Sequence, residues 1–576
     1  MICSPASNQD RLSLPEVEAA PRGGLGAALR DLAHAVNLPG RALARLALSR
    51  AKHRSLAGHP RWALRLSRLL PFYDYPDDRF FRADGAPDDL ERRRRAGFAR
   101  LAAEVRERHP NSLAFARALA ASVSDVEFTN AYRVPFQFRN RVRDELGVVT
   151  VADHSAGPQL RDLDGQWSYD LGGSYGVNLF GTEFYKGCIE RGFERARQLG
   201  PVLGPYHPIV ADNVERLQAL SGLDEVSFHM SGTEAVMQAV RLARYHTGRS
   251  HVVRFAGAYH GWWDGVQAGP GNPRPAHEVY TLQELDPRTL DVLDRRRDIA
   301  CVLVNPLQAL HPNGTPPGDS TLVASDRKAS YQKHAYAAWL AQLRDVCSRR
   351  DIALVFDEVF LGFRLAVGGA QDYFGVRADL VTYGKTLGGG LPVGALCGRH
   401  RWMRRFRDDR PSDICFARGT FNSHPYVMAT MNEFLRHLDQ PAVRASYVGL
   451  EARWDARAAA LNELLARAGV PVRVANMMSV FTTLYTQPGR YNWMLQFYLR
   501  ARGLALSWIG TGRYIFSHDL TCADYATICG RFVEAATAMQ ADGWWWDQSP
   551  SDRQLKRGVL DEVLAARFPI WRRTAT

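Results

Sequence analysis

Short apolar runs that are typical of β-strands alternate with longer helical segments between residues 225 and 384. Because a helical segment follows most of these runs, the strands are expected to lie parallel, joined by helices that cover both faces of a sheet. The pattern therefore predicts an α/β fold built on a mostly parallel sheet. The runs are EVSFHM (225–230), HVVRF (251–255), ACVLVN (300–305), IALVFDEV (352–359) and DLVTYG (379–384).

The regions on either side of this alternation have a different texture, and they divide the chain into five predicted parts. Residues 1–125 are predicted to form an α-helical, basic extension, since the stretch 22–68 holds ten Arg and Lys against one acid. Pro39, Pro60 and Pro110 are expected to separate its helices. The other parts are the beginning of a smaller domain with its linker (126–215), a large domain (216–425), the α+β remainder of the small domain (426–545) and a helical tail (546–576).

Composition limits the class of protein. No apolar run approaches the roughly 20 residues that span a bilayer, and the N-terminal segment lacks the charged start and apolar stretch of a signal peptide. The eight scattered cysteines contain no C-x-x-C pair, which favours reduced thiols and a cytoplasmic protein.

The net charge of +13 is carried mostly by Arg. Such a charge suits an acidic protein, nucleic acid or an anionic lipid surface as a partner. The codon usage of a GC-rich genome is the simpler explanation. Nucleic acid and a membrane are therefore not expected as partners.

Polar side chains follow the first two predicted strands at the point where each strand ends. Ser231, Gly232 and Thr233 open a helical segment, where free backbone N–H groups can hold a phosphate. Taken alone, the same residues equally fit an ordinary helix cap. Tyr259 and His260 lie in a glycine-bounded loop, where an aromatic ring either stacks on a flat ligand or simply packs.

Three further side chains follow the remaining strands. Gln308 can bond a ring hydroxyl, although alone it carries no information. Asp357 closes an apolar run, and a carboxylate there is costly to bury without a partner such as a protonated ring nitrogen. Lys385 precedes the glycine cluster 388–390, and a partly desolvated lysine loses basicity and can form an imine with an aldehyde.

These residues are expected to meet, because ligands of open α/β sheets bind beyond the carboxyl ends of the strands. A phosphate cradle, a stacking aromatic, an acid for a ring nitrogen and an imine-forming lysine are together the parts that pyridoxal 5′-phosphate requires. The sequence therefore predicts a pyridoxal-phosphate site, although each residue alone has an ordinary structural explanation.

The same segments resemble the class-III, fold-type I pyridoxal-phosphate aminotransferases, most closely glutamate-1-semialdehyde 2,1-aminomutase and the aminotransferase modules of polyketide and peptide assembly lines. The resemblance extends over roughly residues 126 to 540. It implies a central sheet of the seven-stranded type, a smaller α+β domain and a homodimer with shared active sites. It is carried by HMSGTEAVMQAVRLARYHTGR (229–249), FAGAYHGWWDG (255–265), LVFDEVFLGFRLAVGGAQDYFGVRADLVTYGKTLGGGLPVGALCGR (354–399) and RGTFNSHP (418–425).

The resemblance also implies roles for individual residues. Lys385 becomes the catalytic Schiff-base lysine, and Asp357 pairs with the pyridine nitrogen. Three residues are placed near the substrate, namely Arg133, Tyr175 and Arg513, and no metal is implied. The cofactor-binding residues are Ser231, Gly232, Thr233, Tyr259, His260, Gln308, Asp357, Val359, Lys385 and Thr420, the last reaching the phosphate of the neighbouring subunit.

Three positions depart from the family. Asn305 replaces the glutamate of a Glu-Pro motif. Leu310 stands where many ω-aminotransferases carry a glutamate that pairs with a mobile arginine, and Gly510 stands where the aminomutases carry a glutamate. The loss of both gating acids favours a specialised aminotransferase of secondary metabolism over the literal aminomutase reaction.

Three functions remain open from the sequence. The first is amination of a keto or aldehyde group on a free or carrier-bound substrate, with an acidic acyl carrier protein as a partner that suits the basic extension. The alternative is an aminomutase acting on a small free substrate. A scaffolding protein with an idle aminotransferase body is the third, and the presence of Lys385 and Asp357 argues against it.

Overall fold

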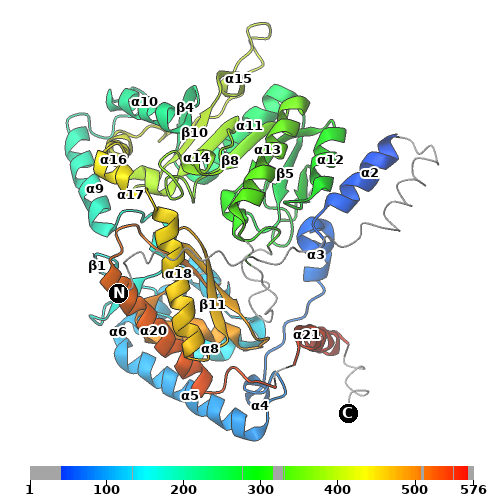
Figure 1. The fold of residues 1–576 in the computed structure, drawn as a ribbon, viewed down its shortest axis with the longest axis vertical. Helices are drawn as coiled ribbons and strands as arrows, with labels where there is room; N and C mark the ends of the chain where they lie inside the picture. The colour runs from blue at the N-terminus through cyan, green and yellow to red at the C-terminus, as the bar shows by residue number, and fades with distance from the viewer. Residues whose placement is uncertain are drawn as a thin grey trace, which may run out of the picture.

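Two bodies make up the chain, a larger one around a central sheet and a smaller one below it (Figure 1). The N-terminal helices run from one body to the other, and the C-terminal helix α21 (Asp552–Arg567) lies beside the smaller body. The computed structural model describes residues 40–132, 134–274, 277–314, 329, 331–507, 512–548 and 550–568.

A seven-stranded sheet forms the centre of the larger body. Its strands run parallel except for β10 (Gly394–Gly398), which pairs antiparallel with both of its neighbours. The prediction of a mostly parallel sheet of the seven-stranded type is therefore confirmed. Across the sheet the order is β4 (Glu225–His229), β10, β9 (Leu380–Gly384), β8 (Ala353–Asp357), β7 (Ile299–Val304), β5 (His251–Phe255) and β6 (Val279–Leu282).

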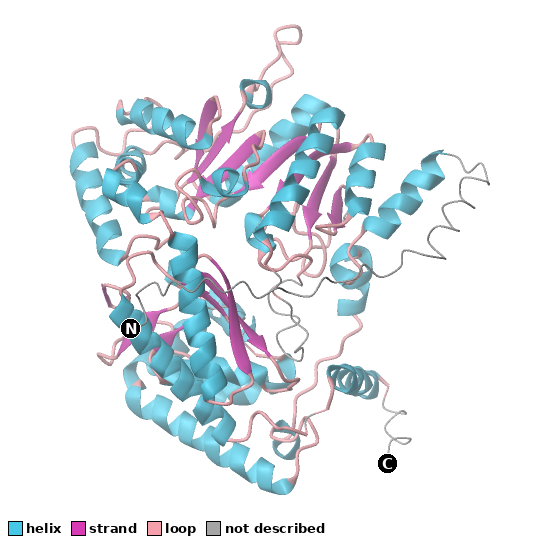
Figure 2. Cartoon of the chain, viewed as in Figure 1, coloured by secondary structure: helices cyan, strands magenta, loops and turns pink. Residues whose placement is uncertain are grey.

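Helices cover both faces of this sheet (Figure 2), which explains why its central strands are apolar along their whole length. In β7, Cys301 and Leu303 pack in the layer of α11 (Gly232–Thr247), whereas Val302 and Val304 pack on the opposite side. The other helices around the sheet are α9 (Thr182–Ala196), α10 (Ile209–Ser221), α12 (Pro287–Arg295), α13 (Lys333–Arg350), α14 (Gly369–Phe374), α15 (His400–Met403), α16 (Pro425–Leu438) and α17 (Pro441–Ser446).

Two small sheets and several helices form the smaller body. In one sheet β13 (Leu504–Ala505) pairs with β3 (Trp167–Asp170), so two segments far apart in the sequence lie side by side. The strands beside this pair are β1 (His154–Ala156) and β2 (Gln159–Arg161); the second sheet contains β11 (Val472–Met477), β12 (Val480–Tyr485) and β14 (Arg513–Ile515); the helices are α18 (Leu450–Arg467), α19 (Leu495–Ala501) and α20 (Cys522–Ala541).

Two of the N-terminal helices begin at prolines that were predicted to separate them. One helix begins at Pro60 and another at Pro110, since the fixed φ of proline suits a first helical position. Pro39 lies outside the described residues. The helices of this region are α2 (Gly40–Ala51), α3 (Pro60–Ser67), α4 (Asp77–Phe80), α5 (Asp88–Arg108), α6 (Pro110–Ala120), α7 (Ser124–Tyr132) and α8 (Arg139–Glu145).

The N-terminal region contacts both bodies. Helix α2 packs on α12 of the larger body, and the backbone N–H of His53 donates to the carbonyl of Thr281 on β6 at 3.1 Å. Helix α5 packs on α19 of the smaller body. The segment therefore follows the molecule from the edge of the large sheet to the smaller body, as the blue ribbon in Figure 1 shows.

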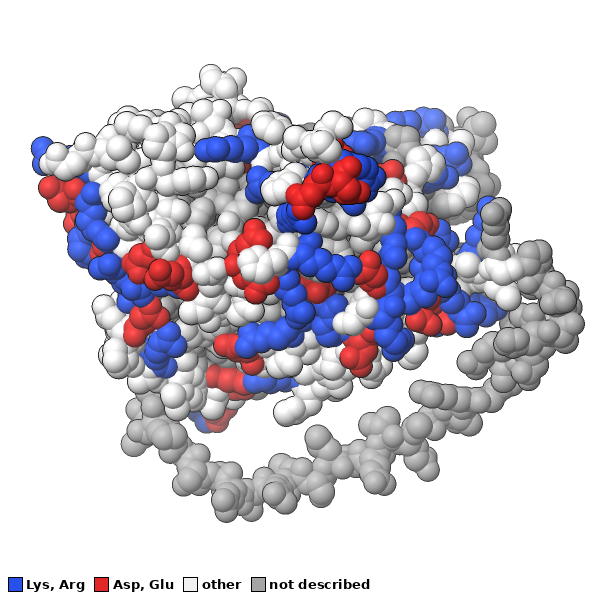
Figure 3. Space-filling model, turned by 90° about the horizontal axis from the view of Figure 1, so that it is seen from above, with Lys and Arg blue, Asp and Glu red and all other residues white. Residues whose placement is uncertain are grey.

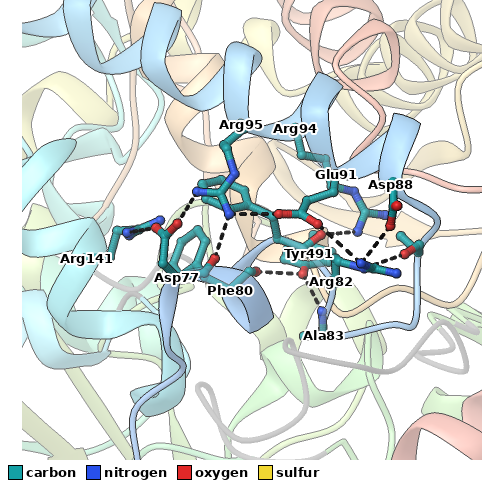
Figure 4. A network of polar contacts seen from close by, with 12 residues as sticks. Asp77, Phe80, Arg82, Ala83, Asp88, Glu91, Arg94, Arg95, Arg141 and Tyr491 are labelled. Carbon is teal, nitrogen blue, oxygen red and sulfur yellow. Dashed lines mark hydrogen bonds and ion pairs between the residues drawn. The ribbon is translucent and has the colours of Figure 1, made fainter.

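A buried ion pair fixes this region to the C-terminal part of the chain. Arg94 on α5 and Asp84 pair at 2.7 Å, with 0% and 2% of their side chains exposed. Arg94 also donates through Nε to the carbonyl of Gly543 at 2.8 Å, and its guanidinium lies 4.5 Å from the centre of the Tyr491 ring. Figure 4 shows Arg94 and Tyr491 within the surrounding polar network. These contacts make the extension part of the folded core.

The predicted C-terminal tail also packs inward. Trp544 and Trp545 are buried. Glu562 on α21 accepts a hydrogen bond from the Tyr73 hydroxyl at 3.1 Å and pairs with Arg79 at 2.9 Å. The tail and the extension therefore hold each other in place.

Six cysteines of the described residues are buried free thiols, as the prediction of reduced thiols requires. Cys522, exposed at the start of α20, is disulfide-bonded, so the prediction is wrong at that position. An exposed thiol can meet a partner that the buried ones cannot reach.

Basic and acidic side chains are interspersed on the face seen in Figure 3. In the described part of the chain many of them form ion pairs, such as Arg244 with Glu278 at 3.3 Å and Arg344 with Asp379 at 2.7 Å. None of the described helices combines the length and the apolar content that a membrane span requires.

Candidate active site

A cavity of about 480 Å³ lies at the carboxyl ends of the parallel strands. Strands β4, β5, β7, β8 and β9 each send the residues that follow them into its wall, as expected for an open α/β sheet. We call it the Lys385 cavity. It brings together nine of the residues predicted from the sequence: Ser231, Gly232, Thr233, Tyr259, His260, Asp357, Val359, Lys385 and Arg513.

Lys385 directly follows β9 and begins the short 3-10 helix η5 (Lys385–Gly388). Its φ of 48° lies in the left-handed region, which is uncommon for a residue other than glycine and is found at functional sites. Burial lowers the pKa of its amine, and the carboxylate of Asp357 partly opposes this lowering. A larger fraction of the amine is therefore neutral and nucleophilic than in a solvated lysine.

Asp357 closes β8 and is held by three donors. Its Oδ1 accepts from the Thr382 hydroxyl and from the backbone N–H of Val359, both at 3.2 Å. Its Oδ2 lies 2.8 Å from Nδ1 of His260. Because both side chains are buried, the pair fixes the orientation of a carboxylate that faces the cavity. Burial lowers the pKa of His260, and Asp357 opposes the shift.

The start of α11 forms another part of the wall. Ser231 is the N-cap residue, and its hydroxyl accepts from the backbone N–H of Glu234 at 3.2 Å. The Glu234 carboxylate accepts in turn from the backbone N–H of Met230 at 2.9 Å. The Ser231 side chain thus caps the helix, which was the ordinary alternative. The backbone N–H groups of Gly232 and Thr233 occupy the first turn, the usual position for binding an anion.

Two glycines allow the loops of the cavity to approach closely. A Cβ on Gly232 would lie 2.7 Å from Cγ2 of Val359 and nearer still to its Cγ1. A Cβ on Gly261 would lie 2.6 Å from the Thr233 hydroxyl, and the φ of Gly261 is +85°. The strand end that carries Val359 and the loop after Tyr259 are therefore both seated against the start of α11.

Gln308 does not line the cavity. Its amide Nε2 donates to the carbonyl of Ala256 at 2.6 Å, in the segment that leads to Tyr259. Tyr259 itself is 56% exposed and lines the cavity. The structure thus shows Gln308 bonded to the backbone three residues before Tyr259.

The other predicted residues lie elsewhere. Thr420 is exposed and is not among the residues around the cavity of its own chain; its expected partner is the neighbouring subunit. Tyr175 is 52% exposed and lines a second cavity, described below. Arg133 and Gly510 lie outside the described residues.

Sequence reasoning missed three neighbours of the site. Thr382 bonds Asp357, and the amine of Lys385 lies 5.7 Å from the centre of the Phe360 ring. Asn305 lines the cavity and donates through Nδ2 to the carbonyl of Tyr259 at 3.2 Å. Asn305 ends the predicted strand ACVLVN, and Phe360 directly follows the run IALVFDEV. The position of both residues at a strand end could therefore have placed them near the site.

Comparison with known proteins tests the family. The profile of the family described as aminotransferase class-III matches residues 142–280 and 332–512, more than half of the chain. The chain belongs to the class-III aminotransferases. Class-III aminotransferases use pyridoxal phosphate, and family members are typically homodimeric, so the chain is a pyridoxal-phosphate enzyme.

Relatives and solved structures agree with this family. The chain is 34% identical over 360 residues to glutamate-1-semialdehyde 2,1-aminomutase of Nitratidesulfovibrio vulgaris (strain DP4), an alignment that covers 61% of this chain and 82% of the relative. The crystal structure of an omega-transaminase from Sphaerobacter thermophilus is similar at 25% identity with a TM-score of 0.57, covering 68% of this chain and 91% of that one. A glutamate-1-semialdehyde-aminomutase from Pseudomonas aeruginosa PAO1 shares the fold at 18% identity and a TM-score of 0.61, covering 78% and 99%.

The residues of this class-III aminotransferase fit its cofactor. The Asp357 carboxylate is 4% exposed and faces the cavity, where a protonated ring nitrogen would compensate its charge. Gly232 and Thr233 line the cavity at the first turn of α11, where backbone N–H groups can bind the cofactor phosphate. Lys385 supplies the amine that the cofactor aldehyde requires.

Proposed function

We propose that this class-III aminotransferase transfers an amino group to the aldehyde or keto group of a cytoplasmic substrate of secondary metabolism, either free or bound to an acyl carrier protein. The observation that supports this most directly is the pair formed by Lys385 and Asp357 in one cavity. Lys385 offers an amine whose pKa is lowered by burial. Asp357 offers a carboxylate fixed by three donors.

Each residue would have a defined task. Asp357, held by His260 and Thr382, would bind the ring nitrogen. The first turn of α11, at Gly232 and Thr233, would bind the phosphate. Val359 and Tyr259 would contact the ring, with His260 acting through Asp357, and Gln308 would support the Tyr259 segment from below.

The bound cofactor supplies an aldehyde that exchanges the amino group and a ring that withdraws electrons. Lys385 would move the proton, because a buried neutral amine can accept a proton at the substrate carbon and return it to the neighbouring position. Exclusion of water by the apolar side chains Val177, Phe360 and Leu391 would keep the amine in this state.

Transamination is preferred over intramolecular transfer because of the missing gating acids. Leu310, at the position of one of them, is fully buried among apolar side chains. The second candidate, an aminomutase acting on a small free substrate, is supported by the name of the relative at 34% identity.

A donor scan distinguishes the two. The purified holoenzyme would be mixed with single amino donors, and conversion of the cofactor to its amino form would be followed by absorbance. Net conversion by an external donor, followed by release of amino product from an added aldehyde, would support transamination. Product formed from a single amino-aldehyde substrate, with no conversion by any external donor, would support the aminomutase.

The homodimer with shared active sites is part of the same proposal. Thr420 lies exposed on its own chain, where a second subunit could bring it to the neighbouring phosphate site. Mixing Lys385→Ala and Thr420→Val subunits tests this, because a mixed dimer would recover one site that has both residues. Recovery of no activity would contradict a shared site.

An acyl carrier protein is the partner that the charge of α2 and α3 suits. Arg61, Arg65 and Arg68 are exposed on and just beyond α3, and the sequence from residue 40 to 72 contains no acid. Opposite charge accelerates and orients such an encounter. The variant with Arg65→Glu and Arg68→Glu should lose activity on a carrier-bound acceptor and keep its activity on a free acceptor. The variant with Arg553→Glu and Arg557→Glu, on exposed positions of α21, matches it in charge; equal activity of both would exclude α3 as the docking site.

A further inference from the structure

A second cavity of about 370 Å³ lies behind the turn that borders the Lys385 cavity. The turn is the 3-10 helix η3 (Gly173–Gly176). On one side, a Cβ on Gly176 would lie 3.6 Å from Cδ of Lys385. On the other side, Ser174 and Tyr175 line the second cavity. We call this the distal cavity; one turn of backbone separates it from the reactive amine.

The turn is held in an unusual conformation. Ser174 and Tyr175 have φ values of 46° and 58°, in the left-handed region. The Asp170 carboxylate accepts from the backbone N–H groups of Gly172 at 2.9 Å and of Gly173 and Ser174 at 3.1 Å. Because such a backbone conformation persists only where the surrounding structure imposes it, this turn forms a rigid wall of the distal cavity. It places the half-exposed Tyr175 between the two cavities.

The side chains around the distal cavity favour an aliphatic ligand. Its charged groups are already engaged: His109 pairs with Asp162 through Nδ1, and Arg500 donates to the carbonyls of Leu506 and Ser507. Of the uncharged side chains, Thr129, Thr150, Gln166 and Ser168 are polar, and the apolar ones come from several separate elements. The apolar members include Val105, Val148, Leu160, Phe497, Leu504 and Leu506.

The extension builds part of this wall. Val105 lies on α5 and His109 caps α6, and both precede residue 142, where the match to the family begins. The distal cavity thus depends on a segment that the family match does not include. Its volume falls in the range of cavities that bind small molecules, roughly 300–1,000 Å³.

We propose that the distal cavity binds the remote aliphatic part of the carbonyl acceptor, so that the extension selects long acceptors over short ones. This rests on the proposed aminotransferase function and names the acceptor class. An acceptor with its carbonyl at Lys385 would pass Tyr175 and place its chain against α5 and β2.

The test compares two aldehydes on the full chain loaded with pyridoxamine 5′-phosphate, which removes the need for a known amino donor. Butanal and octanal are added separately, and the return of the cofactor to its aldehyde form is followed by absorbance. Octanal should react with a higher second-order rate constant, by about fourfold per methylene that is buried. If no aldehyde reacts, the proposed function is wrong; if both react equally, the distal cavity does not bind the chain.

Two substitutions that fill the distal cavity test whether it binds the acceptor or only supports the fold. Val105→Phe on α5 and Leu160→Trp on β2 should each reduce the octanal rate at least tenfold and leave the butanal rate within twofold. Ala103→Phe, exposed on the same helix as Val105, is the matched control and should change neither. Either filling variant suffices if the other fails to fold, as judged by its thermal unfolding. A loss of both rates in equal measure, or an unchanged octanal rate, would overturn the inference.

1-Octanol provides a readout that does not depend on turnover. It should raise the midpoint of thermal unfolding of the wild-type holoenzyme and of Ala103→Phe, because it binds the folded state alone. It should not raise the midpoint of Val105→Phe. An equal rise in all three proteins would show that octanol binds elsewhere and would contradict the assignment.

Discussion

Replacing Gly232 with alanine tests how the start of α11 is seated against the end of β8. The added Cβ would lie 2.7 Å from Cγ2 of Val359, whereas ordinary van der Waals contact begins at 3.4 Å. Relief of the contact with Cγ2 alone needs about 0.7 Å, the difference between these distances, and Cγ1, which would lie nearer still, needs more. Both residues line the Lys385 cavity, so the displacement falls on the predicted phosphate and ring contacts.

The size of the effect follows from two opposing terms. Overpacking a well-packed site costs about 1–3 kcal/mol. Alanine within a helix is favoured over glycine by up to about 1 kcal/mol, although the gain is smaller at a first helical position. If the clash is relieved by displacing the site, the dissociation constant of pyridoxal phosphate should rise roughly 5- to 150-fold. Titration of the apoenzyme with the cofactor, followed by absorbance, measures it.

A double-mutant cycle isolates the contact. Val359→Ala removes both methyl groups that the new Cβ would meet, so Gly232→Ala should cost little in that background. Gly530→Ala is the control, because it lies in α20 with nothing within 4 Å of the added Cβ. If Gly232→Ala weakens cofactor binding by the same factor in the wild type and in the Val359→Ala variant, the steric reasoning is refuted.

Three further predictions concern single side chains. Lys385→Arg should keep a positive charge but reduce the turnover rate roughly a thousandfold or more, since a guanidinium neither condenses with an aldehyde nor transfers the proton of the substrate carbon. Single-turnover absorbance measures this rate. Asp84→Asn should lower the free energy of unfolding by about 3–5 kcal/mol, because it leaves Arg94 buried without its counter-charge; urea unfolding at fixed cofactor concentration measures this, and a change below about 1 kcal/mol would contradict the importance of the pair. Burial raises the pKa of Glu284 from 4.5 to about 8. The contribution of Glu284 to the free energy of unfolding is therefore most favourable below pH 4.5, where the carboxyl is protonated in both states, and this advantage is lost as the pH rises to about 8. Relative to Glu284→Gln, the wild type should lose stability across that window, and a constant difference would contradict the assignment.

Local sequence predicted much of the site because strand ends in a parallel sheet converge. Lys385 and Asp357 each follow an apolar run, and the sheet order brings β9 and β8 side by side. No knowledge of distant contacts was required to place them at one edge. The same reasoning identified the start of α11, since helix-opening residues directly follow β4.

Contacts between distant segments could not be predicted in the same way. His260 is predicted to contact the cofactor, and the sequence did not reveal that it pairs with Asp357, 97 positions away. Gln308 is predicted to face the ring hydroxyl, and the sequence did not reveal that its Nε2 also donates to the carbonyl of Ala256. Both side chains have several hydrogen-bonding options, and only the packed fold decides which partner lies within reach.

The extension shows the same limit on a larger scale. Pro60 and Pro110 correctly predicted where two of its helices begin, but the sequence did not predict which of its arginines are buried. Arg94 is fully buried against Asp84 and Tyr491, and Tyr491 lies far along the sequence. Nothing in the spacing of RRRR distinguished this arginine from its exposed neighbours, because burial of a charge depends on a partner supplied by another segment.

The position of Arg94 and Val105 on one helix links stability to acceptor choice. They are 11 residues apart on α5, about 16 Å along the axis at 1.5 Å per residue. Arg94 fixes the helix through a buried ion pair, and Val105 faces the distal cavity. Exchanging Val105 can therefore alter the length of chain that the cavity accepts without disturbing the anchor, whereas any exchange at Arg94 would displace the whole wall. Acceptor length should consequently vary with substitutions near the C-terminal end of α5, while substitutions near its N-terminal end should change stability first and selectivity only as a result.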